Sequence, residues 1–140
     1  MSPADFDRTV TAVRDFVNRK APAITGIEAT KHFKKSFRDE GFTDDVLKKW
    51  KDITPRRKAQ KRNNHNGKLT GILTDTGELG DSLTWSQEND QVVVSSDLKY
   101  AERHNEGTKG MPKRQFMGPS KKLDQTIMAK FDREIDKIFN

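Results

Sequence analysis

The side chains best suited to chemistry are the consecutive residues His104, Asn105 and Glu106, which could serve as base, orienting group and acid in general acid–base catalysis. Catalytic groups usually come from separate segments, because neighbours in sequence rarely point at one spot. The structural alternative is that His104 packs at the end of a short helix, before the turn at Gly107. We favour that alternative, so the sequence predicts no catalytic residue and no enzyme activity.

Metal and nucleophile chemistry finds little support in the composition. His65 lies in an Asn-Asn-His-Asn-Gly run that resembles the His–Asn pair of some nucleases, but no second ligand set follows on a helix. His32, His65 and His104 are far apart and lack the H-x-x-x-H spacing of a zinc hydrolase. The absence of cysteine excludes disulfides, cysteine-ligated zinc, iron–sulfur clusters and a thiol nucleophile. We therefore expect no metal site and no cofactor.

A basic segment, residues 54–70, holds the whole of the excess positive charge. The chain has 27 Lys and Arg and 21 Asp and Glu. Without the six cations of this segment, the number of basic residues equals the number of acidic ones. The segment contains no acidic residue and almost no apolar one, so we expect a flexible loop or arm. Its cations are Arg56, Arg57, Lys58, Lys61, Arg62 and Lys68.

Two interpretations of this basic segment stay open. Six cations within 13 residues could contact several phosphates of a nucleic acid. No aromatic residue is interleaved for base stacking, so such binding would be non-specific. Otherwise the segment is a solvated loop, or it docks on an acidic protein surface.

The elements that must position these residues begin with helices. The spacing of Phe6, Val10, Val13 and Val17 predicts an amphipathic helix over residues 4–20, with Phe16 beside its apolar stripe. Pro22 should break or kink the path before a second helix, residues 23–40, that ends at Gly41. Residues 43–50 could form one or two further helical turns that lead to Trp50.

The second half of the chain mixes strand and helix signals. Residues 83–86 and 92–94 predict a β-hairpin, which must pack on the helices or pair with more strands. A short helix that ends before Gly107 follows, and Pro119 and Ser120 begin a final helix with an apolar residue at every fourth position from Leu123 to Ile135. The sequence thus predicts one α+β domain, residues 1–140, with N-terminal helices and a long C-terminal helix packed on a small antiparallel sheet.

Three phrases in the second half occur in a characteristic order. They have the forms L-x-x-T-G-x-L-x-x-S-L (residues 73–83), Y-A-x-x-H-x-x-G (100–107) and M-P-x-R-x-F-M-G (111–118). In this order and spacing they resemble the tailed-phage virion morphogenesis family, which includes Mu-type morphogenesis proteins and siphophage tail-completion, neck or head–tail joining proteins. The resemblance assigns structural or interface roles to Thr76, Gly77, Leu79, Ser82, Tyr100, Ala101, His104, Gly107, Pro112, Arg114 and Phe116.

Elementary chemistry gives these motif residues structural tasks. Thr76-Gly77 allows a turn with positive φ. Tyr100 and His104, four residues apart, should share one face of a short helix. Phe116 should anchor the third phrase in the core, which leaves Arg114 available for an ion pair.

The resemblance also implies a function and partners. It implies a structural virion protein of a tailed bacteriophage or prophage that acts in tail completion or head–tail joining as a ring-forming subunit, by analogy a hexamer. Portal or connector and tail terminator or tail tube proteins are the implied partners, with non-specific DNA contact by the basic segment as a further option.

The alternative function is a small nucleic-acid-binding protein that works through residues 54–70. With no signal peptide and no apolar run long enough to span a bilayer, we expect no membrane partner, assembly in the host cytoplasm and a final place in the virion neck or tail.

Overall fold

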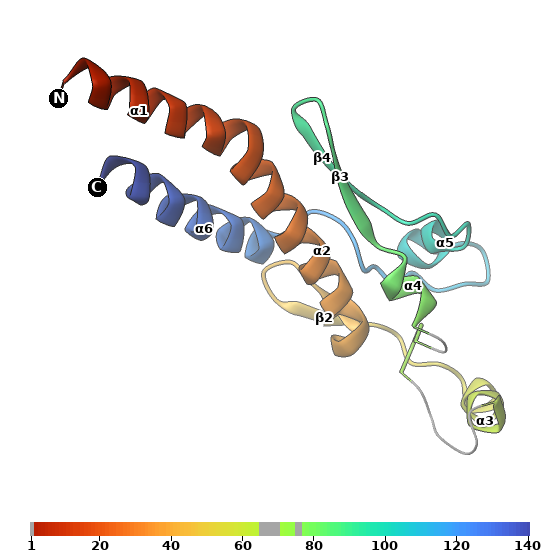
Figure 1. Cartoon of the computed structure of the whole chain (residues 1–140). Helices are drawn as coiled ribbons and strands as arrows, with labels where there is room; N and C mark the ends of the chain where they lie inside the picture. The colour runs from red at the N-terminus through yellow and green to blue at the C-terminus, as the bar shows by residue number, and fades with distance from the viewer. Residues whose placement is uncertain (1, 65–70, 75–76) are drawn as a thin grey trace.

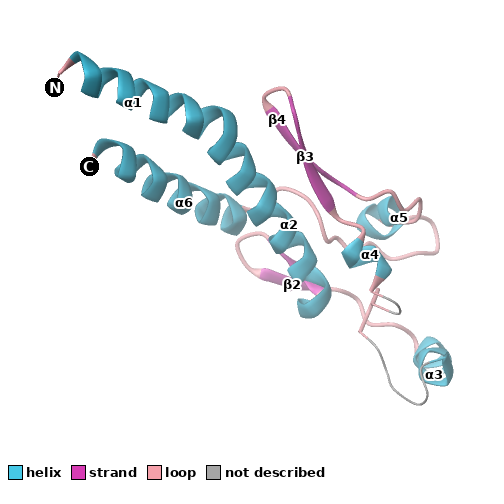
Figure 2. Cartoon of the chain, viewed as in Figure 1, coloured by secondary structure: helices cyan, strands magenta, loops and turns pink. Residues whose placement is uncertain are grey.

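The computed structural model describes residues 2–64, 71–74 and 77–140 and has the predicted α+β architecture, with two small two-stranded antiparallel sheets where one was expected (Figures 1 and 2). The long helices are formed by the two ends of the chain, and the short elements lie between them in sequence. In chain order the elements are α1 (Pro3–Asp15), the π-helical turn Phe16–Lys20, α2 (Ala21–Asp39), β1 (Gly41–Thr43), β2 (Leu47–Lys49), α3 (Pro55–Asn64), α4 (Glu78–Asp81), β3 (Thr84–Glu88), β4 (Gln91–Ser95), α5 (Ala101–Glu106) and α6 (Lys121–Phe139).

The two predicted N-terminal helices form one continuous rod, so Pro22 does not break the path. The rod begins with a capping box between Ser2 and Asp5. Pro22 lacks an N–H, and its ring would crowd the carbonyl four residues earlier in a regular helix. The wider π turn at Phe16–Lys20 directly precedes it, and this is where the rod accommodates the proline. Glu40, and not Gly41, takes the left-handed conformation that ends the rod, with φ at 51°.

Residues 43–50 do not form the predicted helical turns, because β1 and β2 pair there as an antiparallel hairpin. The pairing places Phe42 and Trp50 in the core, where both are buried. Gly41 is needed at the start of β1, since a Cβ there would overlap the carbonyl oxygen of Lys48 on the paired strand. Burial of two aromatic side chains therefore outweighs the helical signal of the Thr43-Asp44 caps.

The predicted hairpin over residues 83–94 is confirmed as β3 and β4, and it packs on α2 as expected. Asn89 makes the tight turn with φ at 55°, a conformation that Asn tolerates better than most residues. The hairpin lies close to the helix because Trp85 covers Gly26, where an added Cβ would overlap the indole ring.

The core is built around aromatic side chains from α2, the β1–β2 hairpin and residues 114–117. Phe37 contacts Phe116 with ring centroids 5.2 Å apart and Trp50 with centroids 5.8 Å apart. The final helix, α6, begins as predicted after Ser120, whose hydroxyl accepts a hydrogen bond from the N–H of Leu123 at 3.1 Å. Leu79 and Leu83 from the first phrase complete this cluster.

The outer parts of α1 and α6 extend beyond this core as a pair of antiparallel helices, with the two chain ends at the same end of the molecule (Figure 1). We call this pair the helix arm: residues 3–20 together with the outer part of α6. At its base Phe16 and Phe131 meet edge to face with centroids 5.5 Å apart. The helix predicted over residues 4–20 is confirmed, but no residue of α1 is fully buried and Phe6 is 58% exposed.

The contact between Gly26 and Trp85 predicts a destabilising glycine substitution. Gly26→Ala improves helix propensity by about 1 kcal/mol, but the new methyl group overlaps the Trp85 ring and should cost about 1–3 kcal/mol. We expect a net loss in the free energy of unfolding, measured by urea denaturation. Gly80→Ala is the matched control, because its Cβ would meet Phe37 at an ordinary 3.5 Å. A Gly26→Ala protein as stable as the wild type would contradict this packing.

Candidate functional site

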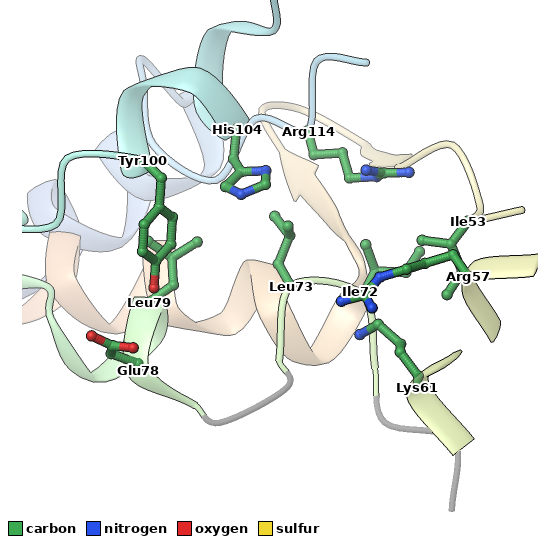
Figure 3. A pocket seen from close by; sticks show the side chains of 10 residues that line it. All are labelled: Ile53, Arg57, Lys61, Ile72, Leu73, Glu78, Leu79, Tyr100, His104 and Arg114. Carbon is green, nitrogen blue, oxygen red and sulfur yellow. The ribbon is translucent and has the colours of Figure 1, made fainter. Parts of the chain in front are cut away.

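One pocket gathers side chains from all three phrases and from the basic segment (Figure 3). It has a volume of about 310 Å³. Because its walls come from segments that are separate in sequence, only the folded chain can form it. The residues that line it are Ile53, Arg57, Lys61, Ile72, Leu73, Glu78, Leu79, Tyr100, His104 and Arg114.

Arg114 is buried, with 8% of its surface exposed, and it forms no ion pair with the described residues, although the sequence left it available for one. Its Nε and Nη2 donate to the carbonyl oxygen of Lys51 at 3.0 and 2.9 Å. The nearby Asp52 carboxylate pairs instead with Lys58, at 2.7 Å. Burial lowers the pKa of Arg114, while the charge of Asp52 opposes that shift. Arg114 therefore acts as a bidentate clamp on the backbone that leads into α3.

His104 and Tyr100 share one face of α5, as predicted, with ring centroids 5.7 Å apart. The Nδ1 atom of His104 is buried and has no hydrogen-bond partner among the described residues. Burial first, and then the positive charge of Arg114, lowers the pKa of His104. Burial raises the pKa of Tyr100, and the charge and hydrogen bond of Glu78 raise it further. Both rings thus pack as neutral groups against the pocket wall.

The consecutive side chains His104, Asn105 and Glu106 do not converge. His104 lines the pocket just described, whereas Asn105 and Glu106 line a different pocket beside β4 and Phe116. The Asn105 Oδ1 atom accepts hydrogen bonds from the backbone N–H groups of Phe116 and Met117, at 2.9 and 3.0 Å. This arrangement agrees with the structural interpretation and gives Asn105 a clamping role that the sequence analysis missed. An Asx residue two positions before a glycine is too common a pattern to have indicated it.

The remaining motif residues build turns and core contacts. Gly77 has φ at 74° and precedes α4, and Gly107 has φ at 77° and ends α5. The Ser82 hydroxyl donates to the carbonyl oxygen of Leu79 at 2.6 Å, and Phe116 is 1% exposed. Leu79 and Ala101 are buried and Pro112 is half-buried, while Thr76 lies outside the described residues.

The basic segment differs from the predicted loop, because residues 55–64 form the helix α3. The hydroxyl of Thr54 accepts a hydrogen bond from the N–H of Arg57 at 3.2 Å, and Pro55 opens the helix. This Thr-Pro pair is a helix-start signal in the sequence, whereas the lack of apolar residues favoured the loop prediction. Residues 65–70, Lys68 included, lie outside the described residues.

The five cations of the segment that the structure describes therefore divide into internal and outward-facing groups. Lys61 is only 3% exposed, and its Nζ donates to the carbonyl oxygen of Gly71 at 2.8 Å. Lys58 pairs with Asp52, and Arg57 lines the pocket. Among the described cations of the segment, Arg56 and Arg62 are exposed.

Over the described parts of the chain, no group of three potential metal ligands is present. The same ranges include no helix long and apolar enough to cross a bilayer. The contacts described above for these residues are packing and backbone clamping.

The fold and the pocket define a small α+β protein whose characteristic residues build a core and a basic-lined recess. The model of the phage virion morphogenesis family matches residues 48–136, and the chain belongs to this family. The match includes all three phrases, which confirms the resemblance. No curated protein and no solved structure matches the chain significantly.

The clamp predicts a specific loss of stability at Arg114. Arg114→Met leaves the carbonyl oxygens of Lys51 and Asp52 without this donor and removes a buried guanidinium, and we expect a loss of about 2 kcal/mol in the free energy of unfolding. The stability of Arg114→Lys should lie between that of the wild type and that of Arg114→Met, because a lysine cannot reproduce the bidentate geometry. Arg103→Met is the control at an exposed arginine on α5 and should change stability by no more than about 0.5 kcal/mol. Equal effects at the two positions would contradict the clamp.

The buried imidazole predicts a stability loss at mildly acidic pH. The folded-state pKa of His104 lies below its ordinary value of 6.5, so the unfolded chain binds more protons as pH falls through that value. The free energy of unfolding should therefore decrease from about pH 7 to about pH 5.5, and His104→Phe should reduce the decrease. Urea denaturation at several pH values measures it. If the free energy of unfolding changes equally with pH in the wild type and in His104→Phe, His104 is not the cause of the decrease.

Proposed function

We propose that this protein is a structural component of a tailed bacteriophage or prophage virion, which acts in tail completion or head–tail joining at the neck. The observation that carries the proposal is family membership over residues 48–136. It is supported by the placement of the motif residues, since those that the structure describes serve the core, the turns and the pocket wall. We propose a structural role rather than an enzymatic one.

Within the virion we propose a ring of identical subunits, by analogy a hexamer, between the portal or connector and the tail terminator or tail tube proteins. Ring subunits meet through heterologous interfaces, in which one patch contacts a different patch on the neighbour. The outward-facing cations Arg56 and Arg62 on α3 suit an acidic patch on such a neighbour. Assembly would take place in the host bacterial cytoplasm.

The alternative, a non-specific nucleic-acid-binding protein, has less support. Of the six cations counted for it, Lys61 is buried, Lys58 is paired with Asp52 and Arg57 lines the pocket. It would rest on Arg56, Arg62 and Lys68. Fewer phosphate contacts give weaker binding and a shallower salt dependence than the sequence suggested.

An in vitro joining assay tests the proposal. Lysates of a phage that lacks the gene should accumulate separate filled heads and tails, and the purified protein should join them into infectious particles, counted by plaque titre and electron microscopy. Native mass spectrometry of joined necks, or of the protein with its partners, should give a closed ring. Lysates that join heads and tails without the protein, or a protein that restores no joining, would contradict the proposal.

The double variant Arg56→Gln/Arg62→Gln separates the two functions. A DNA-binding function predicts salt-dependent binding to random duplex DNA that this variant largely loses, with the salt slope reduced by about one for each lost phosphate contact. Lys51→Gln/Lys109→Gln is a control with the same charge change at exposed positions outside α3. Full joining by a variant that no longer binds DNA would exclude the alternative.

A further inference from the structure

The helix arm presents exposed apolar side chains on both of its helices. On α1 the stripe of Phe6, Val10, Val13 and Val17 flanks the contact with α6: Val10 and Val13 are half-buried, and Phe6 and Val17 are 58% and 59% exposed. On α6 a second stripe is formed by Met128, Ile135 and Phe139, which are 55%, 38% and 63% exposed. These three stand at positions i, i+7 and i+11, so they share one side of the helix.

Both stripes lie on the same side of the arm. The line of contact between the two helices is marked by Phe16 and Phe131. Successive residues of an α-helix are rotated by roughly 100° about the helix axis. On α1 the centre of the stripe is therefore rotated by roughly 90° from Phe16, and on α6 it is rotated by roughly 60° from Phe131. Both rotations have the same sense when each helix is viewed from its N-terminus. Because the helices run antiparallel, equal senses of rotation bring the two stripes to one common face. The opposite side of α1 carries charged residues such as Arg8 and Asp15, and the exposed Thr11 lies roughly 130° from the centre of the stripe.

The size of this face is that of an interaction surface. With about half of each of the five exposed side chains accessible, the face presents roughly 400 Å² of apolar area. Two such faces in contact would bury roughly 800 Å² of apolar surface, and the polar rim would bring the total near the range of stable protein–protein interfaces. A patch of this area compares with the largest patch that a typical monomer exposes, and such patches are often functional.

The charges around the face favour a second copy of this chain. Residues 3–20 carry three acidic and four basic side chains, and α6 carries four acidic and five basic ones. Helices with nearly balanced charges neither repel their own copy nor attract a polyanion. Opposite charges on these elements already pair across helices in the fold, as Lys20 does with Glu134 at 3.6 Å and Lys130 with Glu28 at 2.6 Å.

We propose that the apolar face of the helix arm binds the same face of a second copy, related by a two-fold axis, so that two helix pairs form a four-helix bundle. In a heterologous contact, the apolar face of one arm would meet the polar side of the next arm. The apolar face of that next arm would then stay exposed. The two-fold contact is an isologous interface that joins only two copies. It is therefore separate from the heterologous contacts of the proposed ring and goes beyond that function.

Site-specific labelling tests the contact, because the chain has no cysteine of its own. In Val17→Cys protein, the rate of maleimide labelling should decrease at least about tenfold as the protein concentration rises through the dimer range found by sedimentation. Thr11→Cys, at an exposed position on the other side of α1, should label at one constant rate. A monomer at all concentrations, or equal labelling of both cysteines, would overturn the inference.

A second experiment uses charge on the face. Phe6→Glu/Met128→Glu should raise the dimer dissociation constant by roughly tenfold or more, while Thr11→Glu should leave it unchanged. Circular dichroism verifies that the variants fold, and exposed positions on helices make that outcome the expected one. A folded double variant that dimerises as the wild type would overturn the inference, as would protection of Val17→Cys only when another virion protein is added. A protein that pairs through the arm but never completes necks would contradict the proposed function and leave the inference intact.

Discussion

The fold depends on a buried segment of irregular backbone, residues 114–117, that has no strand partner. A buried backbone without a sheet or helix must find other partners for its N–H and C=O groups, or each orphan group costs about 1–3 kcal/mol. Here Asn105 accepts from two N–H groups, the Ser36 hydroxyl donates to the carbonyl oxygen of Phe116 at 3.3 Å, and the Trp50 indole donates to that of Gln115 at 2.7 Å. Phe116 is thereby held against Phe37 in the centre of the core.

These bonds explain how the three phrases act together. The second phrase supplies α5, which carries Asn105 and offers the carbonyl oxygen of His104 to the N–H of Arg114 at 2.8 Å. The first phrase supplies Leu79 and Leu83, which belong to the same cluster as Phe116. The third phrase is the buried segment itself. Residues of all three phrases therefore meet around this segment, and Arg114 at its start also lines the pocket.

The differences between the predicted and the observed structure have a common cause. The helical signals of residues 43–50 and the lack of apolar residues in 54–64 are local properties. Each was overridden by a contact that the local sequence does not contain: the aromatic core for Phe42 and Trp50, and the carbonyl oxygen of Gly71 for Lys61. Hydrophobic periodicity identifies an apolar stripe but does not say whether the same chain covers it.

By itself, the sequence determined the fold class, the β3–β4 hairpin, the final helix after Ser120 and membership of the phage virion morphogenesis family. These features rest on short-range signals: caps, turn residues, period-two alternation and phrases with fixed spacing. Only the tertiary structure decided that Arg114 clamps the backbone, that Asn105 holds the buried segment and that Lys61 is internal. The reason is that each of these roles belongs to a contact between residues at least ten positions apart in the chain, where the donor and the acceptor are chosen by packing and not by their neighbours in sequence.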